Sequence, residues 1–259
     1  IIMMNYKDIE VSILNFIAII TINRPPNNFF DFSLIGQMAE AINRLDELDS
    51  CRVIILCSKG KHFCAGANFS GDRELVDGID PINKLYKEAV KLFRNKKPII
   101  AVVQGGAIGG GLGVSLVADF RIASPESRFS ANFAKLGFHQ GFGTTITLPR
   151  VVGNQNAAMM LLTGKRLKGD EALKIGLADH LVPHDQLMEK AIELASDIAA
   201  SGPLAVEAIR STVREGLADA VEDIISWELA EQKRLQSTSD FKEGIAASSQ
   251  RRKPNFTRS

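Results

Sequence analysis

At the centre of the chain stands the sequence Pro98-Ile-Ile-Ala-Val-Val-Gln-Gly-Gly-Ala-Ile-Gly-Gly-Gly-Leu-Gly113, in which a β-branched run leads straight into a glycine cluster. The run before Gln104 predicts a buried strand. The glycines are followed by a helical run through Val117, so the loop is expected to open a helix. Glycine has no Cβ, which lets a ligand approach the backbone closely. The stretch therefore predicts a strand, a ligand-accessible loop and a helix in direct succession.

Outward from this stretch, short β-rich runs alternate with amphipathic helical stretches. Strands are expected at 16–22, 52–57, 98–103 and 118–123, and helices at 34–48 and 85–93. From residue 154 onward the pattern is almost wholly helical, with stretches at 154–162, 170–175, 186–200, 204–216 and 218–235. Gly164 and Gly176 follow the first two of these as glycine C-caps. We expect an α/β core with a helical C-terminal extension.

Composition excludes several classes of protein. The 259 residues carry 31 Lys and Arg against 30 Asp and Glu, so the basic bias of a nucleic-acid-binding protein is missing. No apolar run reaches membrane-spanning length. The start of the chain carries Asp8 and Glu10 and lacks the basic segment of an export signal. An odd number of cysteines, three, fits a reducing compartment, so we expect a cytoplasmic protein without nucleic-acid or membrane partners.

The glycine cluster does not fit the nucleotide-binding loops. The dinucleotide pattern begun by Gly109 and Gly111 requires a third glycine where Val114 stands. A phosphate-binding lysine loop requires Ser or Thr after the lysine, but Lys61 is followed by His62. Hydride transfer and ATP chemistry therefore lack support in the sequence.

Metal and nucleophile motifs also fail. His180 and His184 have the spacing of zinc ligands on a helix, but Pro183 lies between them and no third ligand is evident. Ser115 lacks the second glycine of a nucleophile elbow. Cys64 lies in a loop without an evident activating base, so all three cysteines are interpreted as small buried side chains. We expect no metal site.

Two small-residue loops remain, each following a predicted strand. The first spans 60–69 and the second spans 105–113. One backbone N–H from each loop, converging on a carbonyl oxygen, would bind that oxygen more strongly once it becomes an oxyanion. Tight helix–strand packing is the alternative reason for the glycines, and for either loop alone it is the better one.

Taken together and in order, these motifs resemble the crotonase (enoyl-CoA hydratase/isomerase) superfamily. The resemblance spans nearly the whole chain. It is carried by Ile22-Asn23-Arg24-Pro25, Gly60-Lys-His-Phe-Cys-Ala-Gly-Ala67, Ile100-Ala-Val-Val-Gln-Gly105, Gly109-Gly-Gly-Leu-Gly113, Ala118-Asp119, Gly176-Leu-Ala and Phe241-Lys-Glu-Gly244. It implies an α/β fold with a ββα spiral core over residues 1–200 and a helical trimerisation region over 201–259. It also implies a homotrimer or dimer of trimers.

The resemblance further implies an acyl-CoA thioester substrate and no metal or redox cofactor, coenzyme A being part of the substrate. By position, the oxyanion-hole N–H groups fall on Ala67 and Gly110. The implied substrate contacts fall on Ala65, Asn68, Phe69 and Ser70 in and just after the first loop, on Phe133, and on Arg251 in the tail.

The chain departs from the hydratases of this family at the acid–base positions. Where they use two glutamates, Gly113 and Phe133 stand here, and the acid of one isomerase branch falls on Gly141. General acid–base help is worth about 10²–10⁴ in rate, so ordinary hydration should be crippled. Isomerisation, decarboxylation and C–C cleavage stay open.

Other groups could act in place of the missing glutamates. His139, between Gly137 and Gly141, is the candidate base, although a surface or core histidine is equally compatible with the pattern. Asp72 and Glu74 fit a solvated loop better than a catalytic role, His62 is interpreted as a loop residue, and Asp119 as a structural anchor. A non-catalytic acyl-CoA binder that kept the fold is the alternative function, whereas a serine-protease-like relative lacks a Ser–Lys pair. Scattered phenylalanines could form an aromatic acyl pocket: Phe29, Phe30, Phe69, Phe133, Phe138 and Phe142.

Overall fold

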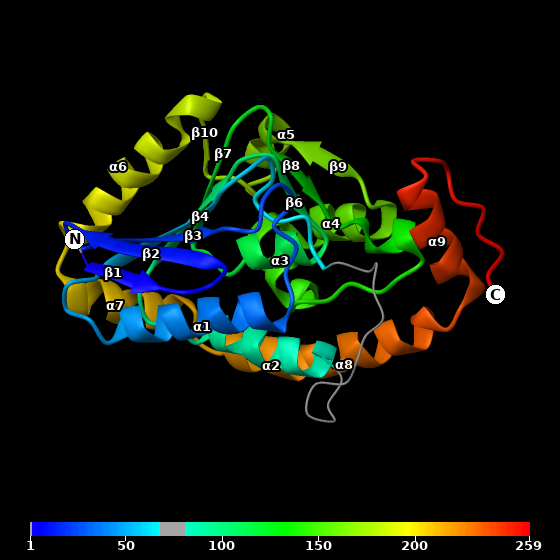
Figure 1. Cartoon of the computed structure of the whole chain (residues 1–259), viewed down its shortest axis with the longest axis horizontal. Helices are drawn as coiled ribbons and strands as arrows, with labels where there is room; N and C mark the ends of the chain where they lie inside the picture. Colours follow the sequence, from blue (N-terminus) through cyan, green and yellow to red (C-terminus); the bar gives the residue numbers. More distant parts are fainter. Residues whose placement is uncertain (1, 68–80) are drawn as a thin grey trace.

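The computed structural model describes residues 2–67 and 81–259 and is built around a seven-stranded sheet (Figure 1). Strands β1 (Ile2–Asn5), β2 (Ile9–Leu14) and β3 (Ile17–Ile22) form an antiparallel meander. From β3 the sheet continues in parallel through β4 (Val53–Ser58), β5 (Ile99–Val103), β7 (Phe120–Ala123) and β10 (His180–Leu181). The β-branched runs of the central strands β4 and β5 suit their position, because both faces of these strands are buried.

Helices cover both faces of the sheet. Helices α1 (Phe32–Asp46) and α2 (Pro81–Phe93) pack against each other on one face, where their apolar sides join the main hydrophobic core. Helix α6 (Leu187–Ala199) covers the other face, and its small residues Ala191 and Ala195 pack on β3, β4, β5 and β7. The glycine loops emerge at the carboxyl ends of β4 and β5, between these layers.

A second, three-stranded sheet extends the core beyond β5. It contains β6 (Gly106–Ile108), β8 (Arg128–Ser130) and β9 (Arg166–Lys168). Around it lie α3 (Gly110–Ser115), the 3₁₀ helix Asn132–Leu136, α4 (Thr144–Thr163) and α5 (Gly169–Lys174). Gly164 adopts φ +57° after α4, and Gly176 adopts φ +78° after α5, as glycine C-caps do.

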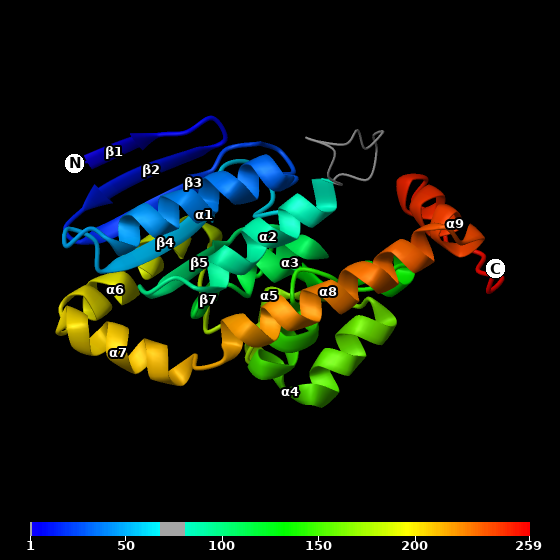
Figure 2. The same ribbon diagram turned by 90° about the horizontal axis from the view of Figure 1, so that it is seen from below.

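The C-terminal part consists of α7 (Pro203–Val213), α8 (Leu217–Gln236) and α9 (Ser239–Ser249). Helix α8 runs along α2 and α4, which brings it beneath the glycine loops, and α9 lies at the end of the molecule far from β1 (Figure 2). The predicted α/β architecture with a helical C-terminal extension is confirmed. The division at residue 200 stays a prediction, because Leu217, Val221 and Ile225 of α8 belong to the same hydrophobic core as the sheet.

Asp119 anchors this arrangement, as its interpretation from the sequence requires. Its carboxylate accepts hydrogen bonds from the Ile99 amide at 2.8 Å, Arg210 Nε at 2.9 Å and Arg214 Nη1 at 3.0 Å. It therefore ties the start of β5 to helix α7 and to the turn that follows it. No helix within residues 2–67 and 81–259 combines the length and apolar character needed to cross a bilayer.

Candidate active site

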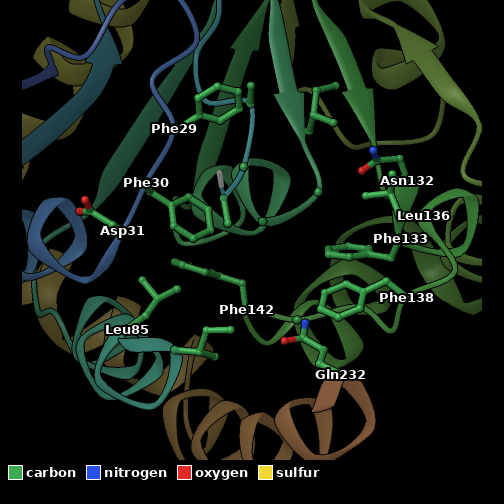
Figure 3. Close-up of a pocket in the computed structure, with 18 of the residues that line it drawn as sticks. Phe29, Phe30, Asp31, Leu85, Asn132, Phe133, Leu136, Phe138, Phe142 and Gln232 are labelled. Carbon is green, nitrogen blue, oxygen red and sulfur yellow. The ribbon is translucent and has the colours of Figure 1, made fainter. Parts of the chain in front are cut away.

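A cavity of about 520 Å³ opens between the two glycine loops on one side and α2 and α8 on the other (Figure 3). Its wall is dominated by aromatic rings. Five of the six phenylalanines expected in an acyl pocket line it, together with Phe32, and Phe69 lies outside the described residues. The wall also contains Ala65, Ala67 and Gly110 from the two loops. The structure thus brings both loops and the aromatic cluster to one place.

Backbone hydrogen bonds hold the two loops side by side. The Cys64 amide donates to the Gly106 carbonyl at 3.0 Å, and the Ile108 amide donates to the Cys64 carbonyl at 3.0 Å. Gly66 adopts φ +90°, and a Cβ on it would lie 2.9 Å from the Ile108 oxygen and 3.6 Å from the Gly110 nitrogen. The first loop therefore passes directly beside the amide that begins α3, and it can do so because residue 66 has no side chain.

The amides of Ala67 and Gly110 both belong to residues of the cavity wall. Neither amide donates to a backbone oxygen of the described residues, whereas the neighbouring Gly109 amide donates to Ser130 at 2.8 Å. Gly110 is the first residue of α3, where an amide has no partner within its own helix. A Cβ on Gly110 would lie 2.4 Å from Cζ of Phe30, so only glycine fits beneath that ring. Two backbone N–H groups at the cavity wall are thus without a backbone acceptor among the described residues.

The three positions that lack acids are surrounded by other side chains. A Cβ on Gly113 would lie 2.7 Å from Cβ of Phe142. A Cβ on Gly141 would lie 2.2 Å from the Tyr86 hydroxyl and 2.3 Å from Gln232 Nε2. Phe133 is buried and lines the cavity. Neighbouring side chains thus occupy the space that a side chain on Gly113 or Gly141 would take.

Phe142 owes its position to an unusual loop. It adopts φ +61°, is 1% exposed and packs its ring 5.4 Å from that of Phe30. The fully buried carboxylate of Glu228 on α8 accepts from the Gly143 amide at 2.8 Å, and from the amide and hydroxyl of Thr145 at 3.1 and 2.6 Å. Burial raises the pKa of Glu228, while these donors act in the opposite direction. Sequence reasoning missed Glu228, because a single glutamate on an amphipathic helix carries no signal of burial.

The histidines stand apart from the cavity wall. His139, the candidate base, is not among the lining residues, and its Nδ1 lies 2.9 Å from the Gln140 carbonyl oxygen. Its catalytic role stays a prediction without support from this geometry. His62 is a loop residue whose Nδ1 accepts the Gly106 amide at 3.0 Å, and burial, followed by the charge of Lys61, lowers its pKa.

The three thiols are buried, and the remaining predicted substrate contacts lie in the tail or outside the described residues. Cys51, Cys57 and Cys64 are all free and buried, and burial raises the pKa of Cys64 to about 12, which disfavours the thiolate that a nucleophile needs. Arg251 is exposed in the tail, and Asn68, Phe69 and Ser70, like Asp72 and Glu74, lie outside the described residues. Within the described residues no three His, Cys, Asp or Glu side chains gather as metal ligands would.

Comparison with known proteins places the chain in a family. The sequence model of the family described as enoyl-CoA hydratase/isomerase matches residues 12–259. The chain belongs to the enoyl-CoA hydratase/isomerase family. A short-chain-enoyl-CoA hydratase of Clostridium acetobutylicum is 33% identical over 245 residues, which cover 92% of each chain. A 1,2-epoxyphenylacetyl-CoA isomerase of Escherichia coli is 29% identical and covers 92% of this chain and 94% of its own length.

The fold agrees with solved structures of the family. An enoyl-CoA hydratase/isomerase from Pseudoalteromonas atlantica superposes with a TM-score of 0.85 at 27% identity, over 97% of this chain and all of its own. The crotonase fold expected from the sequence is therefore confirmed. Hydratases and isomerases both occur among the relatives, so the chain is an enzyme of the enoyl-CoA hydratase/isomerase type.

Proposed function

We propose that the chain processes an acyl-CoA thioester by stabilising its enolate in an oxyanion hole formed by the amides of Ala67 and Gly110. The observation that supports the proposal is the adjacency of the two loops in one aromatic cavity, each contributing an amide without a backbone partner among the described residues. Amides fixed in place before the reaction bind the developing oxyanion more strongly than the neutral carbonyl, which is the basis of catalysis at such sites.

The proposed reaction differs from hydration by paired carboxylates. Among the described lining residues, Asp31 is the one carboxylate, and both of its oxygens are engaged. It accepts the Leu34 amide at 2.9 Å as the N-cap of α1, and it pairs with Arg24 at 3.0 Å. Enolate chemistry without a carboxylate base fits isomerisation, decarboxylation or C–C cleavage. We expect the reaction to need no metal or redox cofactor.

Two substitutions at Gly110 test the oxyanion hole. Gly110→Pro removes the N–H donor, and proline is tolerated at the first position of a helix. Gly110→Ala is the matched control, because its Cβ meets the Phe30 ring in the same way but the N–H remains. Loss of one oxyanion donor costs about 10²–10³ in kcat, so Gly110→Pro should be at least about 100-fold slower than Gly110→Ala. Equal rates for the two variants would contradict the assignment.

A panel of enoyl-, malonyl- and β-ketoacyl-CoA thioesters identifies the reaction. Turnover of one class supports the enzyme, whereas tight binding in calorimetry without turnover of any class favours the alternative, a non-catalytic acyl-CoA-binding homologue. His139→Ala in the same panel decides whether that histidine takes part. We propose a homotrimer or dimer of trimers as the assembly in which this activity occurs.

A further inference from the structure

Besides Asp31, Asn132 and the serines Ser248 and Ser249, the cavity wall contains two buried side chains with polar groups. Tyr86 comes from α2 and Gln232 from α8, and both line the cavity although they are only 7% and 3% exposed. The Tyr86 hydroxyl donates to Gln232 Oε1 at 2.8 Å. Burying a hydroxyl and an amide is costly unless they are hydrogen-bonded, and two apolar side chains would join the helices without that cost. The pair therefore calls for an explanation beyond helix packing.

The amide of Gln232 is held in one orientation. Its oxygen accepts the Tyr86 hydroxyl, and its nitrogen donates to the His139 carbonyl at 3.2 Å. A primary amide has two N–H groups, and within the described residues only this one acceptor is bonded to Nε2. Figure 3 shows the Gln232 side chain reaching from α8 toward the space beside Phe138 and Phe142. One N–H is thus available at the cavity wall. The amide cannot flip without losing its hydrogen bonds to the Tyr86 hydroxyl and to the His139 carbonyl.

Residue 141 makes room for this arrangement. A Cβ there would lie 2.2 Å from the Tyr86 hydroxyl and 2.3 Å from Gln232 Nε2, which no side chain can do without displacing the pair. Gly141 also lines the cavity, so its missing side chain leaves the hydroxyl and the amide at the surface of the wall. The combination of Gly141, Tyr86 and Gln232 forms what we call the amide subsite.

We infer that the amide subsite binds a neutral oxygen, a keto or hydroxyl group, carried by the acyl chain of the thioester. The inference rests on the proposed function, because it assumes that the acyl chain occupies this cavity. An N–H donor in an apolar wall recognises an uncharged acceptor. An acyl chain that carries a free carboxylate is disfavoured, because no Lys, Arg or His is among the described residues of the wall. Gln232 contacts the ligand, and Tyr86 is a positioning residue that holds the amide.

Calorimetry with chain-matched ligands tests the subsite without any need for turnover. The ligands are hexanoyl-CoA, 4-oxohexanoyl-CoA and 5-oxohexanoyl-CoA, which differ only by the presence and place of one keto oxygen. One net hydrogen bond corresponds to about 3- to 10-fold in affinity, so the wild type should bind at least one oxo ligand that much more tightly than hexanoyl-CoA. Gln232→Met and Tyr86→Phe should bring this ratio to about 1.

Tyr6→Phe is the matched control. It removes the hydroxyl of the other tyrosine, which lies outside the cavity lining and has no hydrogen-bond partner among the described residues, and it should keep the wild-type ratio. An unchanged ratio in folded Tyr86→Phe overturns the subsite, and so does a wild type that binds all three ligands equally. If none of the ligands binds the wild type, the proposed function falls as well. Should Gln232→Met not fold, Tyr86→Phe carries the test alone.

Discussion

Phe142 shows how one residue can set the shape of this cavity. A non-glycine residue in the left-handed region costs on the order of 1–3 kcal/mol, and such strain persists only where the surroundings impose it. Here the φ of +61° places the ring against Phe30 and over Gly113, while Glu228 holds the following turn. The strained residue thus packs over Gly113, and in the proposed site we expect it to limit how deep an acyl chain can reach.

We predict that Phe142→Ala lengthens the acyl chain that the cavity accepts. Removal of the ring leaves a void next to Phe30, so affinity should shift from short toward longer saturated acyl-CoA ligands, measured by calorimetry over a series of chain lengths. Loss of a buried phenylalanine also lowers the free energy of unfolding by about 3–5 kcal/mol. Phe63→Ala is the control, because Phe63 is fully buried outside the cavity lining and should destabilise without moving the chain-length preference.

The site residues differ in how far sequence could reveal them. Ala67 and Gly110 could be named from the sequence because its motifs, in their order, resemble a known family whose positions carry over without coordinates, and their role stays a prediction. Tyr86 and Gln232 are 146 positions apart, and neither differs in type from an ordinary helical residue. Their meeting depends on the crossing of α2 and α8 and on the missing side chain of Gly141, which only the packed structure displays.

At the scale of elements, a polar cluster fastens the N-terminal meander to α1. Asp8, in the β1–β2 turn, accepts from Arg24 Nη2 at 2.7 Å and from Gln37 Nε2 at 2.8 Å. Arg24 also pairs with Asp31, the N-cap of α1. The edge of the sheet is therefore held by charge-assisted bonds to the same helix that borders the cavity.

We predict that Asp8→Asn lowers the free energy of unfolding by about 1–2 kcal/mol at pH 7. The hydrogen bond from Arg24 lowers the pKa of Asp8, although burial opposes it. A lowered folded-state pKa means that the stabilisation is present above the carboxyl's usual pKa of about 4 and is lost as pH falls through the folded-state value. Urea unfolding at pH 7, 5, 4 and 3.5 should show wild type and variant converging toward the acid end. A gap that widens there would contradict the ion pair.

The matched control for this carboxylate is Asp49→Asn. Asp49 is exposed and forms no hydrogen bond or ion pair with the described residues, so the variant should stay within about 0.5 kcal/mol of the wild type at pH 7. An equal loss of stability in both variants would mean that the Asp8 effect comes from net charge and not from its contacts.

Most elements with long apolar patterns could be predicted, whereas the three-residue strands could not. Strands β3, β4, β5 and β7 and helices α1, α2 and α6 lie close to their expected ranges because their apolar patterns are long. Strands β6, β8 and β9 have three residues each, too few to show a period. The first half of α4 was missed because Pro149 and Gly153, with φ +78°, break the helical signal inside it. Helix α9 was missed as well.

At the scale of the whole molecule, α7 carries apolar side chains that the single chain leaves exposed. Among its residues only Arg210 is buried, while Leu204, Ile209 and Val213 are 80%, 64% and 65% exposed. Leu162 of α4 is 79% exposed as well. Apolar side chains gathered on one helix indicate a surface that another chain covers. The proposed trimer supplies such a cover, and the helix lies within the predicted trimerisation region.

We predict that the wild type elutes in light scattering at three or six times the chain mass of 28.2 kDa. Ile209→Asp combined with Leu204→Lys places charges at two exposed positions of α7. Removing these charges from water on association costs more free energy than the apolar contact contributes, so the mass should fall to that of one chain. Leu14→Lys is the matched control, since Leu14 is 55% exposed on β2, outside α7, and its substitution should leave the assembly intact. A wild type that stays monomeric at micromolar concentration would contradict the proposed trimer. A double variant that still assembles would show that the contact between chains does not depend on α7.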